Sequence, residues 1–161
     1  MEEALERTPS KEEALALHHH VNTFAQHCEV LEDHLAKNTG NGAEHYVVEI
    51  ARLNLNVQEL TGLYIMKSWG TVDDKEYFAE VKKILADYDK IYDDIMAADS
   101  TLVSDKVKKK LKGLKKHFML FEVMAESDSG IYVPRLISKK ADMIQKETEN
   151  ILAEEEQEKE K

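Results

Sequence analysis

The chain has a single cysteine, Cys28, and only two prolines and six glycines among its 161 residues. One cysteine cannot form an internal disulfide, and so few helix breakers leave long stretches free to be helical. The chain also has no run of eighteen apolar residues, which a membrane-spanning helix would need. We therefore expect a helix-rich protein without an internal disulfide and without a segment inserted in a membrane.

Positive charge is the minority: 22 lysines and arginines face 32 aspartates and glutamates, for a formal net charge of −10. An acidic surface repels phosphate backbones and anionic lipids, so nucleic acid is not an expected partner. Residues 106–116 are a lysine-rich exception. Val107, Leu111 and Leu114 form an apolar stripe within that stretch, so we expect the lysines on an outer face, near acidic neighbours.

Signatures of catalysis are also missing. The sequence has no glycine-rich phosphate loop and no Gly-x-Ser-x-Gly motif. Cys28 falls at a core position of its predicted helix, where a free thiol behaves as a small hydrophobic group. We predict that the protein is not an enzyme and that it carries no cofactor.

The seven histidines include His20, His27 and His34, which recur at seven-residue intervals. Residues seven apart on a helix are separated by about 10 Å along its axis, whereas a zinc ion lies about 2 Å from each ligand. No two of these histidines can therefore share one ion. No pair of segments supplies the two Glu-x-x-His motifs of a di-iron bundle either. We predict no metal site.

Apolar residues recur at intervals of three and four along five segments, which is typical of amphipathic helices. These segments cover about residues 10–37, 44–69, 73–97, 102–126 and 134–151. Ser10 and Glu13 form a capping box, Asp73 or Thr71 is expected to cap the third helix, and Pro134 suits the first turn of the last. The predicted core positions are Ala14, Leu17, Val21, Phe24, Cys28, Leu31, Leu35, Ile50, Leu53, Val57, Leu60, Tyr64, Val81, Ile84, Tyr88, Ile91, Ile95, Val107, Leu111, Leu114, Phe118, Phe121, Ile137, Ala141, Ile144 and Ile151.

Such helices with short connections predict an all-α fold. We expect an up-and-down antiparallel four-helix bundle with an additional or extended N-terminal helix. The length suits one domain over residues 1–161, with its own core. We expect order over about residues 10–152 and a frayed acidic tail at 153–161, which is polar all round.

The helix at 44–69 carries more hydrogen-bonding groups than packing requires, namely Arg52, Asn54, Asn56, Gln58 and Thr61. Asn54, Gln58 and Thr61 share one stripe, because they are four and three residues apart. If this stripe is covered, its groups need hydrogen-bond partners. A neighbouring helix or a second subunit can supply them, and so can a small polar ligand. The residues alone favour hydrogen bonds to a neighbouring helix or a second subunit over a ligand.

Residues 51–58 (ARLNLNVQ), followed by LYIM at 63–66 and by Trp69 and Gly70, resemble a degenerate form of a known motif. It is the GRQRMLSQ helix of the PilJ-type sensor domain, found in methyl-accepting chemotaxis transducers of type IV pili. Arg52 and Gln58 match the motif, whereas Asn54 stands in place of its second arginine. Similar helix spacing extends the likeness over about residues 44–151.

The resemblance implies an extracytoplasmic sensor module, periplasmic or extracellular, that takes part in chemotaxis signal transduction. Such a module would bind a small molecule between helices or at a homodimer interface, and it would pass on a small helix displacement. Arg52 would be the charged anchor, and Tyr64 and Trp69 would be pocket walls. The polar contacts would come from Asn54, Asn56, Gln58 and Thr61. The alternative is a scaffold or protein-interaction bundle without a small-molecule ligand.

Overall fold

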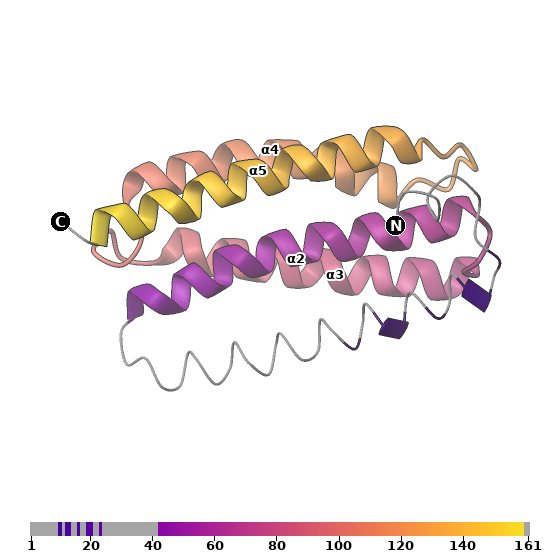
Figure 1. The fold of residues 1–161 in the computed structure, drawn as a ribbon, viewed down its shortest axis with the longest axis horizontal. Helices are drawn as coiled ribbons and strands as arrows, with labels where there is room; N and C mark the ends of the chain where they lie inside the picture. Colours follow the sequence, from indigo (N-terminus) through magenta and orange to yellow (C-terminus); the bar gives the residue numbers. More distant parts are fainter. Residues whose placement is uncertain are drawn as a thin grey trace.

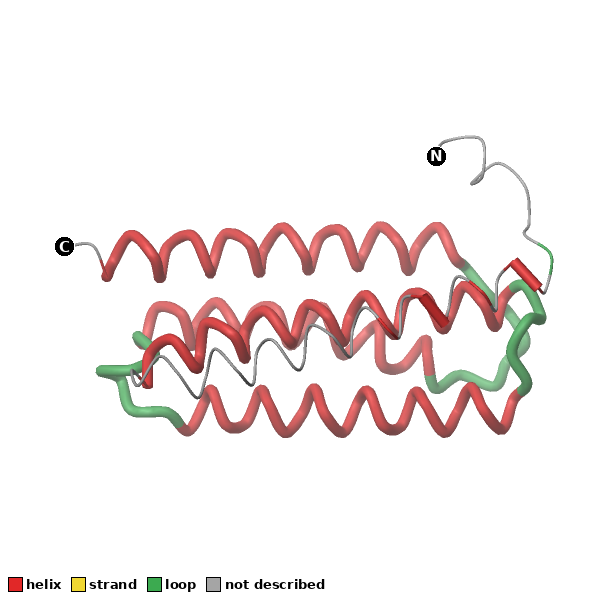
Figure 2. Tube along the Cα trace, turned by 60° about the horizontal axis from the view of Figure 1, so that its bottom comes forward, coloured by secondary structure: helices red, strands yellow, loops and turns green. Residues whose placement is uncertain are grey.

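The computed structural model describes residues 42–159, together with Ser10, Glu12, Glu13, Ala16, His19, His20 and Thr23. Residues 42–159 form four helices: α2 (Gly42–Ser68), α3 (Asp74–Ala97), α4 (Asp105–Ala125) and α5 (Pro134–Lys159). Figure 1 shows α4 and α5 as one layer over α2 and α3, with each helix antiparallel to the next. Short connections at the two ends of the bundle join them (Figure 2). The predicted all-α, up-and-down four-helix bundle is confirmed.

The predicted N-terminal helix lies largely outside the described residues, as do Cys28, His27, His34 and the apolar stripe from Ala14 to Leu35. The capping box at its start is present. The backbone N–H of Ser10 donates to Oε2 of Glu13 at 2.8 Å, and the N–H of Glu13 donates to Oγ of Ser10 at 3.2 Å. The other described residues of this segment are helical.

The apolar stripes predicted for α2, α3, α4 and α5 meet in one core. Every predicted core residue from Ile50 to Ile151 is buried. The core also contains Tyr77, whose hydroxyl donates to the carbonyl of Ala125 at 2.8 Å, and Val103 from the α3–α4 connection. Packing of apolar faces along near-parallel helices therefore holds the bundle together.

Local capping sets the helix ends. Asp73, not Thr71, caps α3, because its side chain accepts a hydrogen bond from the N–H of Glu76 at 3.0 Å. Ser104 caps α4, so this helix begins three residues later than the predicted start at about residue 102. The backbone N–H of Val103 bonds instead to the carbonyl of Asp99, which forms a turn before the cap. Helix α5 continues to Lys159, so it includes most of the tail for which we expected fraying.

Candidate functional site

A carboxylate of α3 joins two polar residues of α2. Nη2 of Arg52 lies 3.4 Å from Oδ2 and 3.5 Å from Oδ1 of Asp87, and the side-chain amide of Asn56 donates to the same Oδ2 at 3.1 Å. Nη1 of Arg52 lies 3.4 Å from Oε1 of Glu49, one turn earlier on α2. Residues 49, 52 and 56 follow i, i+3, i+7 spacing, so α2 presents all three to α3.

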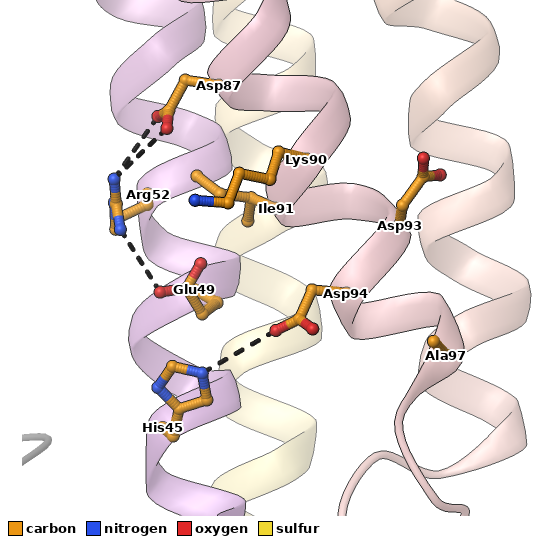
Figure 3. Close-up of a pocket in the computed structure, with 9 residues that line it drawn as sticks. All are labelled: His45, Glu49, Arg52, Asp87, Lys90, Ile91, Asp93, Asp94 and Ala97. Atoms are coloured by element: carbon orange, nitrogen blue, oxygen red, sulfur yellow. Dashed lines mark hydrogen bonds and ion pairs between the residues drawn. The ribbon is translucent and has the colours of Figure 1, made fainter.

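Glu49, Arg52 and Asp87 border a groove between α2 and α3 with a volume of about 500 Å³ (Figure 3). It is lined by His45, Glu49, Arg52, Asp87, Lys90, Ile91, Asp93, Asp94 and Ala97. Four acidic residues thus line the groove, together with two permanent cations and one histidine. The groove is acidic on balance, which disfavours an anion and favours a cation.

The two ends of the groove differ. At the end near the start of α2, Nε2 of His45 lies 3.9 Å from Oδ2 of Asp94, and both side chains are substantially exposed. At the other end, Arg52 retains only 28% of its side-chain exposure and Glu49 only 11%. In Figure 3 the Lys90 side chain extends toward α2 at the level of Arg52. Partial burial strengthens the Arg52 contacts relative to the open pair at His45.

The remaining expected polar contacts on α2 do not line the groove, and one of them, Gln58, contacts α5. Nε2 of Gln58 lies 3.5 Å from Oε1 of Gln145, and the hydroxyl of Thr61 donates to the carbonyl of Val57 at 2.7 Å. Oδ1 of Asn54 is buried and has no hydrogen-bond partner within the described residues. The structure therefore separates Asn54, Gln58 and Thr61 from the groove.

The two expected pocket walls lie near the far end of α2. Tyr64 is 2% exposed, packs edge-on against Tyr132, and accepts a hydrogen bond from the backbone N–H of Val133 at 3.1 Å. Trp69 is 36% exposed at the end of α2. Twelve residues separate Arg52 from Tyr64, or about 18 Å of helix. The seven expected site residues do not form one pocket.

The sequence analysis missed Asp87 and Glu49. Neither residue stood out in the sequence, yet Asp87 is half-buried and bonded to two residues of α2. Asp87 directly precedes the core residue Tyr88. A residue beside the apolar stripe of a helix lies close to the neighbouring helix, so this position indicated an interhelical contact. The sequence did not indicate which helix would lie opposite.

No three His, Cys, Asp or Glu side chains are close enough to hold a metal ion in the part of the chain that the structure describes. None of the described helices is long and apolar enough to cross a membrane. Comparison with family models, curated proteins and solved structures finds no match for this chain. The likeness to PilJ-type sensor domains therefore depends on the residues around Arg52 alone.

Proposed function

We propose that this chain is the ligand-binding bundle of a sensory system and that the ligand binds in the groove between α2 and α3. The single observation that supports this is the half-buried carboxylate of Asp87, which Arg52 and Asn56 of α2 hold in an otherwise open groove. A half-buried network at a groove is more typical of a binding site than a fully exposed ion pair.

The groove favours a small cationic ligand such as a primary amine. Glu49, Asp87, Asp93 and Asp94 outnumber Arg52 and Lys90, so an ammonium group gains attraction there that nitrate or a carboxylate does not. The guanidinium of Arg52 is already bonded to two carboxylates, which reduces its availability for an anion. In this arrangement Arg52 holds Asp87 in place, whereas the family likeness implies that Arg52 is itself the charged anchor of the ligand.

Binding there would act on the contact between two helices. An amine that bonds to Asp87 competes with Arg52 and Asn56, which are the polar links from α2 to this carboxylate. Weakening these links would allow α3 to shift along α2. Shifts of about 1 to 2 Å between packed helices are a known way to transmit a signal.

A thermal-shift screen tests the proposal with four ligand classes: primary amines, amino acids, small carboxylates and nitrate. A ligand at about 100 times its Kd adds about 2.7 kcal/mol to the stability of the native state, which raises the melting temperature by several degrees. We expect amines to give such a shift and nitrate to give none.

Asp87→Asn and Asp89→Asn form a matched pair for this screen. Both remove one negative charge from α3, but Asp89 pairs with Lys115 of α4 and does not line the groove. The amine shift should disappear in Asp87→Asn and persist in Asp89→Asn. Equal loss in both variants would mean that only the net charge matters and would count against a site at Asp87.

A second candidate function is a protein-interaction module, and one observation favours it. Large apolar side chains are exposed on α4, on α5 and on the connection between them, above all Val123 at 66% and Ile131 at 75%. Exposed apolar patches often mark protein contacts. If no ligand class raises the melting temperature, this becomes the better proposal.

We further propose an extracytoplasmic location and a homodimer, in line with the PilJ-type likeness of residues 51–58. The sequence that flanks this chain in its natural gene tests the location, since a hydrophobic span on either side would anchor the bundle at a membrane. Light scattering of the purified protein at several concentrations tests the dimer. A monomer at all concentrations would contradict it.

A further inference from the structure

The exposed apolar side chains gather on one layer of the bundle. Of the eight large apolar residues that are exposed in the described part of the chain, seven lie on α4, on α5 or on their connection: Met119, Leu120, Val123, Ile131, Val133, Leu136 and Met143. The eighth, Trp69, directly follows α2. Helices α2 and α3, which line the groove, make up the other layer (Figure 1). This apolar surface is therefore separate from the groove.

Two of these side chains meet where α4 and α5 lie side by side. Nε2 of His117 on α4 lies 3.7 Å from Oε1 of Glu147 on α5, and the two helices run antiparallel. Leu120 is three residues after His117, and Met143 is four residues before Glu147. Both steps lead about one turn in the same direction, so Leu120 and Met143 lie close together at the outward side of this seam. Leu136, seven residues before Met143, continues the apolar line on α5.

The charges around this surface are mainly positive, although the chain as a whole has a net charge of −10. The exposed charged residues of α4 from residue 109 onward and of α5 up to residue 150 are Lys109, Lys112, Lys116, Glu126, Arg135, Lys139, Asp142, Lys146 and Glu149. Lys115 pairs with Asp89 of α3, but Lys112 and Lys116 form no ion pair with any residue that the structure describes. These two lysines are therefore available to an acidic partner.

We propose that the outward face of α4 and α5 binds an amphipathic helix of another protein, with apolar residues on one side and glutamate or aspartate beside them. Laying the apolar side of a helix on an apolar surface is a common mode of peptide recognition. Methionine suits this use, because its unbranched side chain adapts to different partners. Met119 and Met143 are exposed here, and Met124 is half-buried. The proposal names a partner for the protein-interaction surface described above and does not depend on the amine groove.

Charge disfavours the two other occupants of such a surface. A two-fold contact with a second copy would pair this face with itself, so two surfaces of net positive charge would meet. An anionic membrane attracts lysines, but Glu126, Asp142 and Glu149 on the same face, and the net charge of −10, oppose it. A single acidic helix can place its carboxylates opposite the lysines alone.

A designed peptide tests the site in the full chain. The stretch from Lys112 to Val123 is about 17 Å long, so a helical peptide of about 16 residues covers it. The probe carries a fluorescent label, leucine at every third or fourth position and glutamate on either side of the leucines. We expect binding with a Kd of about 10 to 100 μM by fluorescence anisotropy, weakened by added salt. The same peptide with lysine in place of glutamate should bind about tenfold more weakly.

Lys116→Glu and Lys83→Glu form a matched pair of variants. Both make the same change of charge at an exposed lysine, but Lys83 lies on α3, in the other layer, near Glu80. We expect Lys116→Glu to weaken binding of the acidic peptide about fivefold, and Lys83→Glu to change it less than about twofold. Leu120→Ser should weaken binding about tenfold, and it should leave the melting temperature nearly unchanged because Leu120 is 43% exposed.

Four results would overturn the proposal. Equal binding of the acidic and basic peptides, or no binding of the acidic peptide up to about 1 mM, would exclude an acidic-helix site. Equal effects of Lys116→Glu and Lys83→Glu would mean that only the net charge matters. Cosedimentation with vesicles of phosphatidylglycerol and phosphatidylcholine that Lys116→Glu abolishes, without peptide binding, would assign the face to a membrane. A dimer in analytical ultracentrifugation that Leu120→Ser dissociates would assign it to a second copy.

Discussion

The ring of Tyr88 on α3 stacks on the ring of Phe118 on α4, with centroids 3.5 Å apart and planes within 7° of parallel. Tyr88 is fully buried, and its hydroxyl has no hydrogen-bond partner among the described residues. The ammonium of Lys115 lies 4.8 Å from the same ring centroid. The ring of Tyr88 therefore makes stacking and cation–π contacts, whereas its buried hydroxyl makes no hydrogen bond with the described residues.

Tyr88→Phe should stabilise the protein, because it keeps the ring and removes a buried hydroxyl that lacks a partner. Such a group costs about 1 to 3 kcal/mol, so we expect the free energy of unfolding to rise by about 1 kcal/mol. Chemical denaturation followed by circular dichroism measures this change, with an unchanged dependence on denaturant concentration.

Tyr77→Phe is the matched control and should act in the opposite direction. The hydroxyl of Tyr77 is also buried but donates to the carbonyl of Ala125 at 2.8 Å. Its removal leaves that carbonyl without this donor, and we expect a loss of about 1 kcal/mol. If both variants lost stability equally, the Tyr88 hydroxyl would have a partner in solution.

The same two tyrosines predict how stability depends on alkaline pH. Burial raises the pKa of Tyr77 and of Tyr88 above the ordinary value of 10.0, because the phenolate is poorly solvated inside the bundle. The folded-state pKa of each tyrosine exceeds its unfolded-state pKa. The stability that depends on the two phenols being neutral is therefore fully present below about pH 10 and is lost as the pH rises further. Unfolding should therefore begin above about pH 10.

Absorbance at 295 nm and circular dichroism, recorded together during a base titration, check this prediction. The buried tyrosines should ionise only as the helices unfold. In the double variant Tyr77→Phe, Tyr88→Phe, stability should fall less steeply above pH 10. Ionisation of all six tyrosines before any loss of helix would contradict the burial of these rings.

The sequence was sufficient to predict the fold because each helix encodes its own inward face. The spacing of Val81, Ile84 and Tyr88 marks one side of α3 whatever its neighbours are. Capping is equally local, so Asp73 was identified as a candidate cap from adjacent residues. The start of α4 was missed because the turn at Asp99 uses three backbone and side-chain bonds that no periodicity shows.

The site could be predicted only in part, because it depends on which faces meet. Arg52 and Asn56 stood out on α2, but their partner Asp87 is 31 residues beyond Asn56. Asn54 and Gln58 stood out equally on the sequence, but neither lines the groove, and Gln58 instead contacts Gln145 of α5. Periodicity gives the angle of a residue about its own helix but not the identity of the opposing helix.

Gly113→Ala should stabilise α4. A β-carbon at Gly113 would meet nothing within 4 Å, so the substitution adds no clash, and alanine in a helix interior is favoured over glycine by about 0.5 to 1 kcal/mol. Gly70→Ala is the contrast. Gly70 has φ of +69°, a conformation that disfavours alanine, so it should lose about 1 kcal/mol. Thermal unfolding of both variants checks the opposite signs.

Arg52→Ala should destabilise the bundle more than Asp87→Asn does, because it leaves two carboxylates without their shared cation. Glu49 and Asp87 would then both lack Arg52, and Glu49 is 9% exposed. Since the pair with Asp87 is partly open to solvent, we discount its strength and expect about 1 to 2 kcal/mol for Arg52→Ala, against at most about 1 kcal/mol for Asp87→Asn.

The double variant completes the cycle and should give a coupling of about 0.5 to 1 kcal/mol. Added salt should reduce this coupling, because screening acts on exposed charges. A coupling near zero in low salt would mean that Arg52 and Asp87 do not interact in solution, and it would remove the main support for a binding site at this groove.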